Sequence, residues 1–144
     1  MFEPSQADVR RFFCGTFQKW QEQAPMEAME TLAAYWMALH PEYHPVLGDL
    51  EQALADMGNP KAGQENPFLH LSMHLSISEQ CSIDQPRGIR QAVELLTTRL
   101  HDLHAAHHQV MECLGDMLLE SQRSGRPPDP AAYIAAVQKR ATAV

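Results

Sequence analysis

Hydrophobic residues recur every three or four positions along almost the whole chain. The segments with this spacing are residues 5–23, 25–39, 46–57, 67–81, 88–99, 103–123 and a terminal segment that begins at residue 129. This period is typical of amphipathic helices, and no stretch of strand length alternates between apolar and polar residues. We therefore expect an all-α protein: one domain over residues 1–144, an irregular bundle of about five to seven helices, with no sheet of three or more strands.

Local signals support several of these boundaries. Ser5 can cap the first helix, and Asn66 followed by Pro67 is a strong helix start. A polar loop is expected over residues 58–65. The helix that Pro67 opens carries apolar residues around its whole circumference, namely Phe68, Leu69, Leu71, Met73, Leu75 and Ile77. Because a helix that is apolar on all sides belongs at the centre of a bundle, we expect residues 67–81 to form the most buried helix.

Composition and charge narrow the classes of function. The chain has 144 residues, 44% of them hydrophobic, which is enough for a substantial core. A net charge of −7 argues against nucleic acid as a partner. The longest apolar run, residues 32–39, is too short to span a bilayer, and no secretory signal is visible at the N-terminus. Three widely spaced cysteines favour free thiols, so we expect a cytosolic protein that binds neither nucleic acid nor membrane.

Eight histidines are the main chemical feature of the sequence. Residues four apart lie on one face of a helix, so His70 and His74 share a face of one predicted helix, and His104, His108 and Glu112 line a face of another. Imidazole nitrogens and a carboxylate oxygen are ligands that suit zinc, iron or manganese. If the two helices are neighbours in the bundle, these residues can hold one divalent metal ion (Fe, Mn or Zn).

Other residues have a weaker case as ligands. His40 and His44 form a third pair, but each precedes a proline, which displaces the preceding residue from the α region, so we expect both at a kinked corner. Cys81 is either a further ligand or a small core residue. Because Cys81 and Cys113 lie on predicted helices that carry histidines, a Cys–His nucleophile pair also stays open. His101 is expected to be an ordinary surface or partly buried side chain, as is His107.

An alternative interpretation of the histidines needs no metal. The set His70, His74, His104 and His108 can form a buried hydrogen-bond network that fixes the packing of helices. The protein would then be a non-catalytic interaction module, whose acidic surface and Met-rich helices bind a protein partner. A homo-oligomer is also open. The chain contains no P-loop, no dinucleotide-binding glycine motif, no nucleophile elbow and no H-E-x-x-H zinc helix, so the sequence indicates no reaction.

Several motifs resemble those of a known family. They are the opening Met-Phe-x-Pro-Ser, the segment His40-Pro41-Glu42-Tyr43-His44, the block from Asn66-Pro67-Phe68-Leu69-His70 to Asp84-Gln85-Pro86, and Met111-Glu112-Cys113-Leu114-Gly115. Together they are similar to a family of small bacterial proteins known only as a domain of unknown function. This resemblance implies a helical, single-domain cytosolic protein and supplies no substrate or cofactor. The histidine spacing alone also resembles that of hemerythrin-like and DinB-like metal-binding bundles, although the order of ligands differs.

Overall fold

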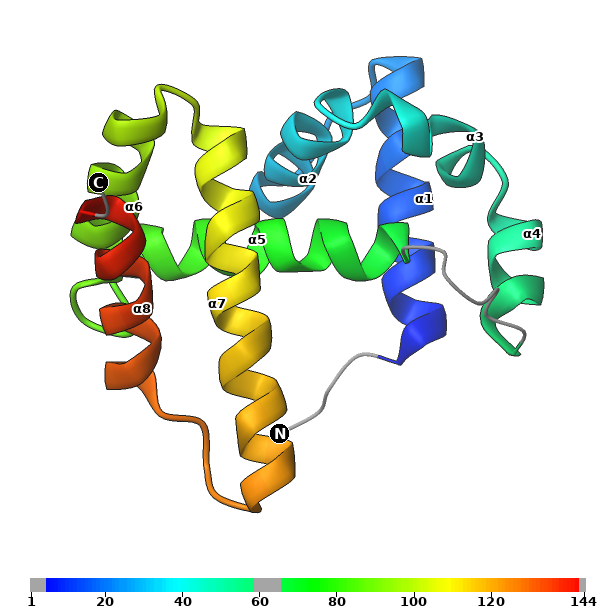
Figure 1. Cartoon of the computed structure of the whole chain (residues 1–144). Coiled ribbons are helices and arrows are strands. Elements are labelled where there is room, and N and C mark those ends of the chain that lie inside the picture. Colours follow the sequence, from blue (N-terminus) through cyan, green and yellow to red (C-terminus); the bar gives the residue numbers. More distant parts are fainter. Residues whose placement is uncertain (1–4, 59–65, 143–144) are drawn as a thin grey trace. The chain divides into compact units, whose positions relative to one another are not determined.

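The computed structural model describes residues 5–58 and 66–142, and all the regular secondary structure in these ranges is helical (Figure 1). This confirms the predicted all-α class. The predicted polar loop lies outside the described residues, apart from Gly58. The elements are α1 (Gln6–Glu22), α2 (Ala28–Ala38), the 3₁₀ helix η1 (Pro41–Tyr43), α3 (His44–Leu47), α4 (Leu50–Ala55), the 3₁₀ helix η2 (Asp56–Gly58), α5 (Pro67–Ile83), α6 (Ile89–Leu100), α7 (Leu103–Ser124) and α8 (Pro130–Thr142).

The described residues contain eight α-helices, more than the expected five to seven, because the helix predicted over residues 46–57 is divided. The helix α3 ends at Gly48, and the next residue, Asp49, has a non-helical backbone with φ −134° and ψ 79°. The Asp49 carboxylate accepts a hydrogen bond of 3.1 Å from the backbone N–H of Gln52. A side-chain cap at a non-helical residue begins a new helix, which explains the additional element.

The two caps that the sequence predicts are both present. Ser5 forms a capping box, in which its hydroxyl accepts from the Asp8 N–H at 3.1 Å and its own N–H donates to the Asp8 carboxylate at 3.3 Å. Asn66 caps α5, because its side-chain oxygen accepts from the N–H groups of Phe68 and Leu69 at 3.0 and 3.3 Å. The start of the helix that carries His70 and His74 is therefore fixed locally.

The chain divides into two compact units, Met1–Leu75 and Ser76–Val144, and α5 continues from the first into the second. In the first unit, α1 packs against α2, α3 and α4. Its core is built from apolar side chains of these helices, of η1 and of the first half of α5. The buried members are Phe13, Cys14, Phe17, Ala33, Trp36, Met37, Tyr43, Leu47, Ala53, Phe68 and Leu71.

In the second unit, α6, α7 and α8 each pack against the other two. The buried apolar residues of these helices include Ile89, Ala92, Val93, Leu96, Ala106, Val110, Leu114, Tyr133 and Val137. The Tyr133 hydroxyl donates a hydrogen bond of 2.7 Å to the side-chain oxygen of Gln80, which ties α8 to the second half of α5. Over the described ranges, no helix has both the length and the apolar character needed to cross a membrane.

Burial of α5 differs from the expectation. The sequence predicts a helix buried on every side, but α5 has one buried face, formed by Phe68, Leu71, His74 and Ile77 at intervals of three residues. Leu69, which lies between them in the sequence, is 59% exposed. The core therefore does not cover α5 on all sides, because apolar side chains around the helix outnumber the positions that the core covers.

We predict that the substitution Leu71→Ala lowers the free energy of unfolding by about 2–5 kcal/mol, because the side chain is fully buried and its removal leaves a cavity. Leu69→Ala is the matched control on the same helix and should change stability by less than about 1 kcal/mol. Urea unfolding followed by tryptophan fluorescence measures both. Equal losses in the two variants would contradict the buried face assigned to α5.

Candidate metal centre

His40 lies at a corner of the chain between two helical elements. It follows the last turn of α2 and precedes Pro41, the first residue of η1. Its backbone has φ −128° and ψ 63°, outside the α region, as the sequence predicts for a residue before proline. The side chain turns back toward α2 and is only 2% exposed. His40, which the sequence favours only weakly as a metal ligand, is thus one of the most buried polar residues in the described chain.

The protonation of the His40 ring follows from its hydrogen bond to the backbone. Its Nδ1 lies 2.7 Å from the carbonyl oxygen of Trp36. A carbonyl oxygen only accepts, so Nδ1 carries the hydrogen and donates it. In the neutral ring Nε2 therefore carries the lone pair that a metal ion requires.

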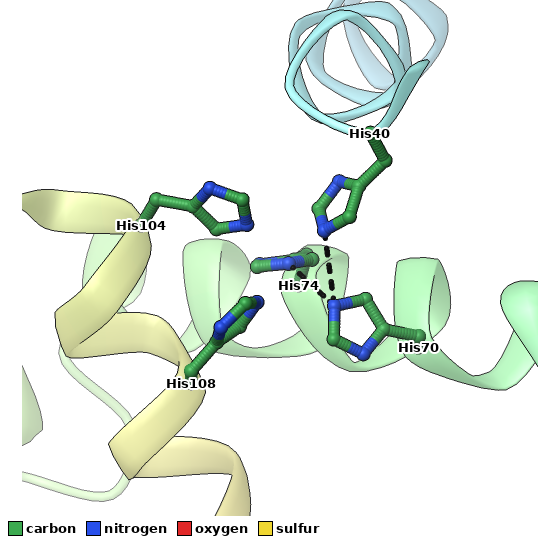
Figure 2. A group of neighbouring side chains, drawn as sticks. All are labelled: His40, His70, His74, His104 and His108. Carbon is green, nitrogen blue, oxygen red and sulfur yellow. Dashed lines mark hydrogen bonds between the residues drawn. The ribbon is translucent and has the colours of Figure 1, made fainter. Parts of the chain in front are cut away.

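The Nε2 atoms of His40, His70 and His74 lie close together. His70 and His74 project from successive turns of α5, and the Nε2 of His70 lies 3.0 Å from that of His40 and 3.2 Å from that of His74 (Figure 2). His74 is fully buried and His70 is half-buried. The first unit thus assembles a group of three imidazoles, here called the histidine triad, from α5 and the corner after α2.

Aromatic side chains cover the faces of two of these rings. The His74 ring stacks on Trp36 with centroids 4.0 Å apart and planes at 12°. The His40 ring stacks on Tyr43 with centroids 5.1 Å apart and planes at 2°. Both aromatic residues are buried, so the stacked rings have little freedom to turn and the donor atoms of His40 and His74 are held in place.

The second unit presents a pair of histidines on α7. Asp102 begins this helix, since its carboxylate accepts from the His104 N–H at 3.0 Å. His104 and His108 follow on one face, with ring centroids 4.4 Å apart, as their spacing predicts. His104 is half-buried and His108 is exposed. Each of these two histidines offers one ring nitrogen that can ligate a metal ion.

Two residues that the sequence proposes as ligands have other partners. His44 donates from Nε2 to the carbonyl oxygen of Met37 at 2.8 Å, and its ring packs against Phe17. Glu112 is exposed, and its carboxylate accepts a hydrogen bond of 2.9 Å from the guanidinium of Arg140. His44, unlike His40, therefore does not join the histidine triad. Glu112 is engaged in an ion pair with Arg140 of α8.

The remaining histidines of the second unit differ from the histidine triad in their surroundings. His107 is 2% exposed in α7, more buried than expected, and burial lowers its pKa to about 4, with smaller lowering effects of His104 and His108. It is therefore a neutral core residue at physiological pH. His101 is exposed and has φ 58°, the left-handed conformation in which α6 ends.

The cysteines are free thiols, as their spacing predicts, and none has the character of a nucleophile. Burial raises the pKa of Cys14 and of Cys113, and it raises the pKa of Cys81 to about 11. A reactive cysteine needs a lowered pKa, since the thiolate is the nucleophile. The raised pKa values of the three thiols therefore do not support the Cys–His nucleophile pair that the sequence leaves open.

The chain belongs to the family described as Domain of unknown function (DUF1841), whose model matches residues 5–139. This confirms the resemblance that the sequence motifs indicate. Comparison with curated proteins gives no match, and neither does comparison with solved structures. Any functional conclusion must therefore come from the histidine group itself.

We predict that Cys81 reacts slowly with iodoacetamide in the native protein. With a pKa of about 11, its thiolate is scarce at pH 8, and the rate should be at least about tenfold below that of the unfolded chain. The rate should continue to rise with pH up to about 10, because deprotonation is incomplete throughout that range. Peptide mapping by mass spectrometry follows each cysteine separately. A rate that levels off near pH 8.5 would show an ordinary thiol and contradict the raised pKa.

Proposed function

We propose that this protein binds a divalent transition-metal ion through the Nε2 atoms of the histidine triad, with His104 and His108 as further ligands. The observation that carries the proposal is the convergence of three Nε2 atoms at separations of 3.0 and 3.2 Å. Two ligands that are each about 2.0–2.1 Å from one ion lie about 2.9–3.4 Å apart in octahedral or tetrahedral geometry. Both of these separations, His40–His70 and His70–His74, fall within that range.

A hydrogen-bond network explains the triad less well. Because His40 carries its hydrogen on Nδ1, its Nε2 can only accept, and His70 must donate to it from Nε2. That nitrogen then has no in-plane lone pair to accept from His74, and its one hydrogen is already used. One N–H group therefore serves two close nitrogen–nitrogen contacts, whereas a metal ion accepts a lone pair from each of the three nitrogens.

The wider ligand set includes α7. His104 and His108 lie on one face of this helix with ring centroids 4.4 Å apart, and each offers one ring nitrogen, so both are suited to serve as further ligands. Glu112 is left out of the proposed set because its carboxylate is paired with Arg140. A set of imidazoles alone suits iron or zinc better than manganese, which prefers oxygen ligands.

The histidine triad is also arranged as a ligand set should be. Metal-ligating histidines commonly donate their second ring nitrogen to a carbonyl or carboxylate, which fixes the tautomer and the ring orientation. The bond from His40 Nδ1 to the Trp36 carbonyl oxygen has this form. The stacking of Trp36 on His74 and of Tyr43 on His40 restricts the rings further, so little ordering remains for the ion to impose.

We predict that untagged protein holds about one metal ion per chain, measured by elemental analysis, and that zinc or ferrous iron binds the metal-free protein in a competition titration. The double variant His70→Ala, His104→Ala should lose at least about 100-fold in affinity, because it removes two nitrogen ligands. Affinity should fall below about pH 6, since protons compete with the ion for neutral imidazole.

The matched control is His101→Ala, which removes an exposed histidine outside the proposed set and should leave the affinity unchanged. If His101→Ala weakens binding as much as the double variant does, the ion binds to histidines nonspecifically. If the wild-type protein binds no ion while His70→Ala, His104→Ala unfolds more easily, the histidines form a structural hydrogen-bond network instead, as in the alternative drawn from the sequence.

A further inference from the structure

A cavity of about 400 Å³ lies within the second unit, where the chain passes from α7 to α8. Its walls are the second half of α7, the loop that follows this helix and the first half of α8. None of the histidines lines it, so the cavity is separate from the candidate metal centre. Pockets that hold small molecules have volumes of roughly 300–1,000 Å³, and this cavity falls within that range.

The floor of the cavity is apolar. Met117 of α7 and Tyr133 of α8 line it, and Tyr133 is buried with its hydroxyl already bonded to the side-chain oxygen of Gln80 at 2.7 Å. Ala132 and Ala136 lie one turn apart on α8, and their short side chains leave the space beside Met117 open. A thioether and a phenol ring form a surface on which an apolar group, above all an aromatic ring, packs well.

The charged groups around this floor are mostly acidic. Three of the described lining residues carry carboxylates, Asp116, Glu120 and Asp129, and one carries a guanidinium, Arg126. Asp116 and Glu120 are four residues apart, so they lie on one face of α7. Glu120 also contacts Arg123 at 3.8 Å, but both of these side chains are exposed and such a pair is weak. The cavity therefore combines an apolar floor with a net negative rim.

The helix ends at the cavity also favour a cation over an anion. The N-terminus of α8 could attract an anion, but the Asp129 carboxylate already accepts from the N–H groups of Ala131 and Ala132 at 3.1 and 3.2 Å. The other helix end at the cavity is the C-terminus of α7 at Ser124, which carries the negative end of a helix dipole. An anionic ligand would meet these charges unfavourably.

We infer that this cavity binds a small organic cation, a primary amine attached to an apolar body of about the size of an aromatic ring. The ammonium group lies at the Asp116 and Glu120 carboxylates, with which it forms charge-assisted hydrogen bonds. The apolar body packs against Met117 and Tyr133. This ligand site is independent of the proposed metal site, since the two share no residue.

Three probes of nearly equal size and different charge test the inference. They are 2-phenylethylamine, 2-phenylethanol and phenylacetate, each titrated at pH 7 into full-length protein that carries ¹³C-labelled methionine methyl groups. The amine should shift the Met117 methyl signal with saturation, because its ring packs on this side chain. The alcohol should bind at least about tenfold more weakly, since it lacks the charge, and phenylacetate more weakly still. The Met117 signal is assigned by its loss in Met117→Leu.

A double variant tests the role of the carboxylates. Asp116→Asn combined with Glu120→Gln keeps the size of both side chains and removes their charge. The double variant should bind 2-phenylethylamine at least about tenfold more weakly and bind 2-phenylethanol as the wild-type protein does. The matched control is Glu94→Gln, which removes an exposed carboxylate of α6 that does not line the cavity and should leave both affinities unchanged.

A second pair of variants tests the location. Ala132→Leu fills part of the cavity and should lower the affinity for the amine at least about tenfold. Ala132 is exposed, so the larger side chain is compatible with folding. Ala135→Leu adds the same side chain at an exposed position of α8 that does not line the cavity, and it should leave the affinity unchanged.

Each contrary result overturns the inference. If none of the probes moves the Met117 signal, the cavity is not a ligand site. If the alcohol or phenylacetate binds as tightly as the amine, or if the double variant keeps its affinity for the amine, the site does not select a cation. If Ala132→Leu binds as the wild-type protein does, the amine binds elsewhere. None of these results bears on the metal site, which is tested by its own titration.

Discussion

The hydrogen bond from His40 Nδ1 to the carbonyl oxygen of Trp36 is the interaction on which the candidate metal centre depends. It returns the side chain onto the last turn of α2 and gives the opposite nitrogen the lone pair that faces His70. This geometry requires α2 to end before His40, because a residue within the helix would direct its side chain along the helix surface. Pro41 enforces that end by displacing His40 from the α region.

The same stretch of α2 connects the site to the core of the first unit. Trp36 is fully buried, its carbonyl oxygen holds His40, and its indole stacks on His74. Burying imidazoles among apolar groups is unfavourable unless their nitrogens have partners. The affinity of the triad for the proposed ion would contribute directly to the stability of the folded state.

Features that depend on residues three or four apart could be predicted from the sequence. The caps at Ser5 and Asn66 and the pairing of His104 with His108 on one face are of this kind, because the helix geometry alone determines them. The corner at His40 could also be predicted, since it depends on the next residue.

Features that depend on contacts between distant segments could not be predicted. The importance of His40 comes from a ring on α5, 30 residues further along the chain. The pairing of Glu112 with Arg140 spans 28 residues. The exposure of Leu69 and the burial of His107 likewise depend on which helix face the core covers, and hydrophobicity alone does not determine that face.

The most direct test of this account is a ¹⁵N spectrum of the histidine ring nitrogens, recorded before and after one molar equivalent of Zn²⁺. We expect the Nε2 signals of His40, His70 and His74 to move to metal-bound positions, while Nδ1 of His40 keeps its hydrogen and its bond to the Trp36 carbonyl oxygen. The signals of His101 should not move. Unchanged Nε2 signals of the triad in the folded protein, or zinc binding through Nδ1 of His40, would contradict the proposed centre.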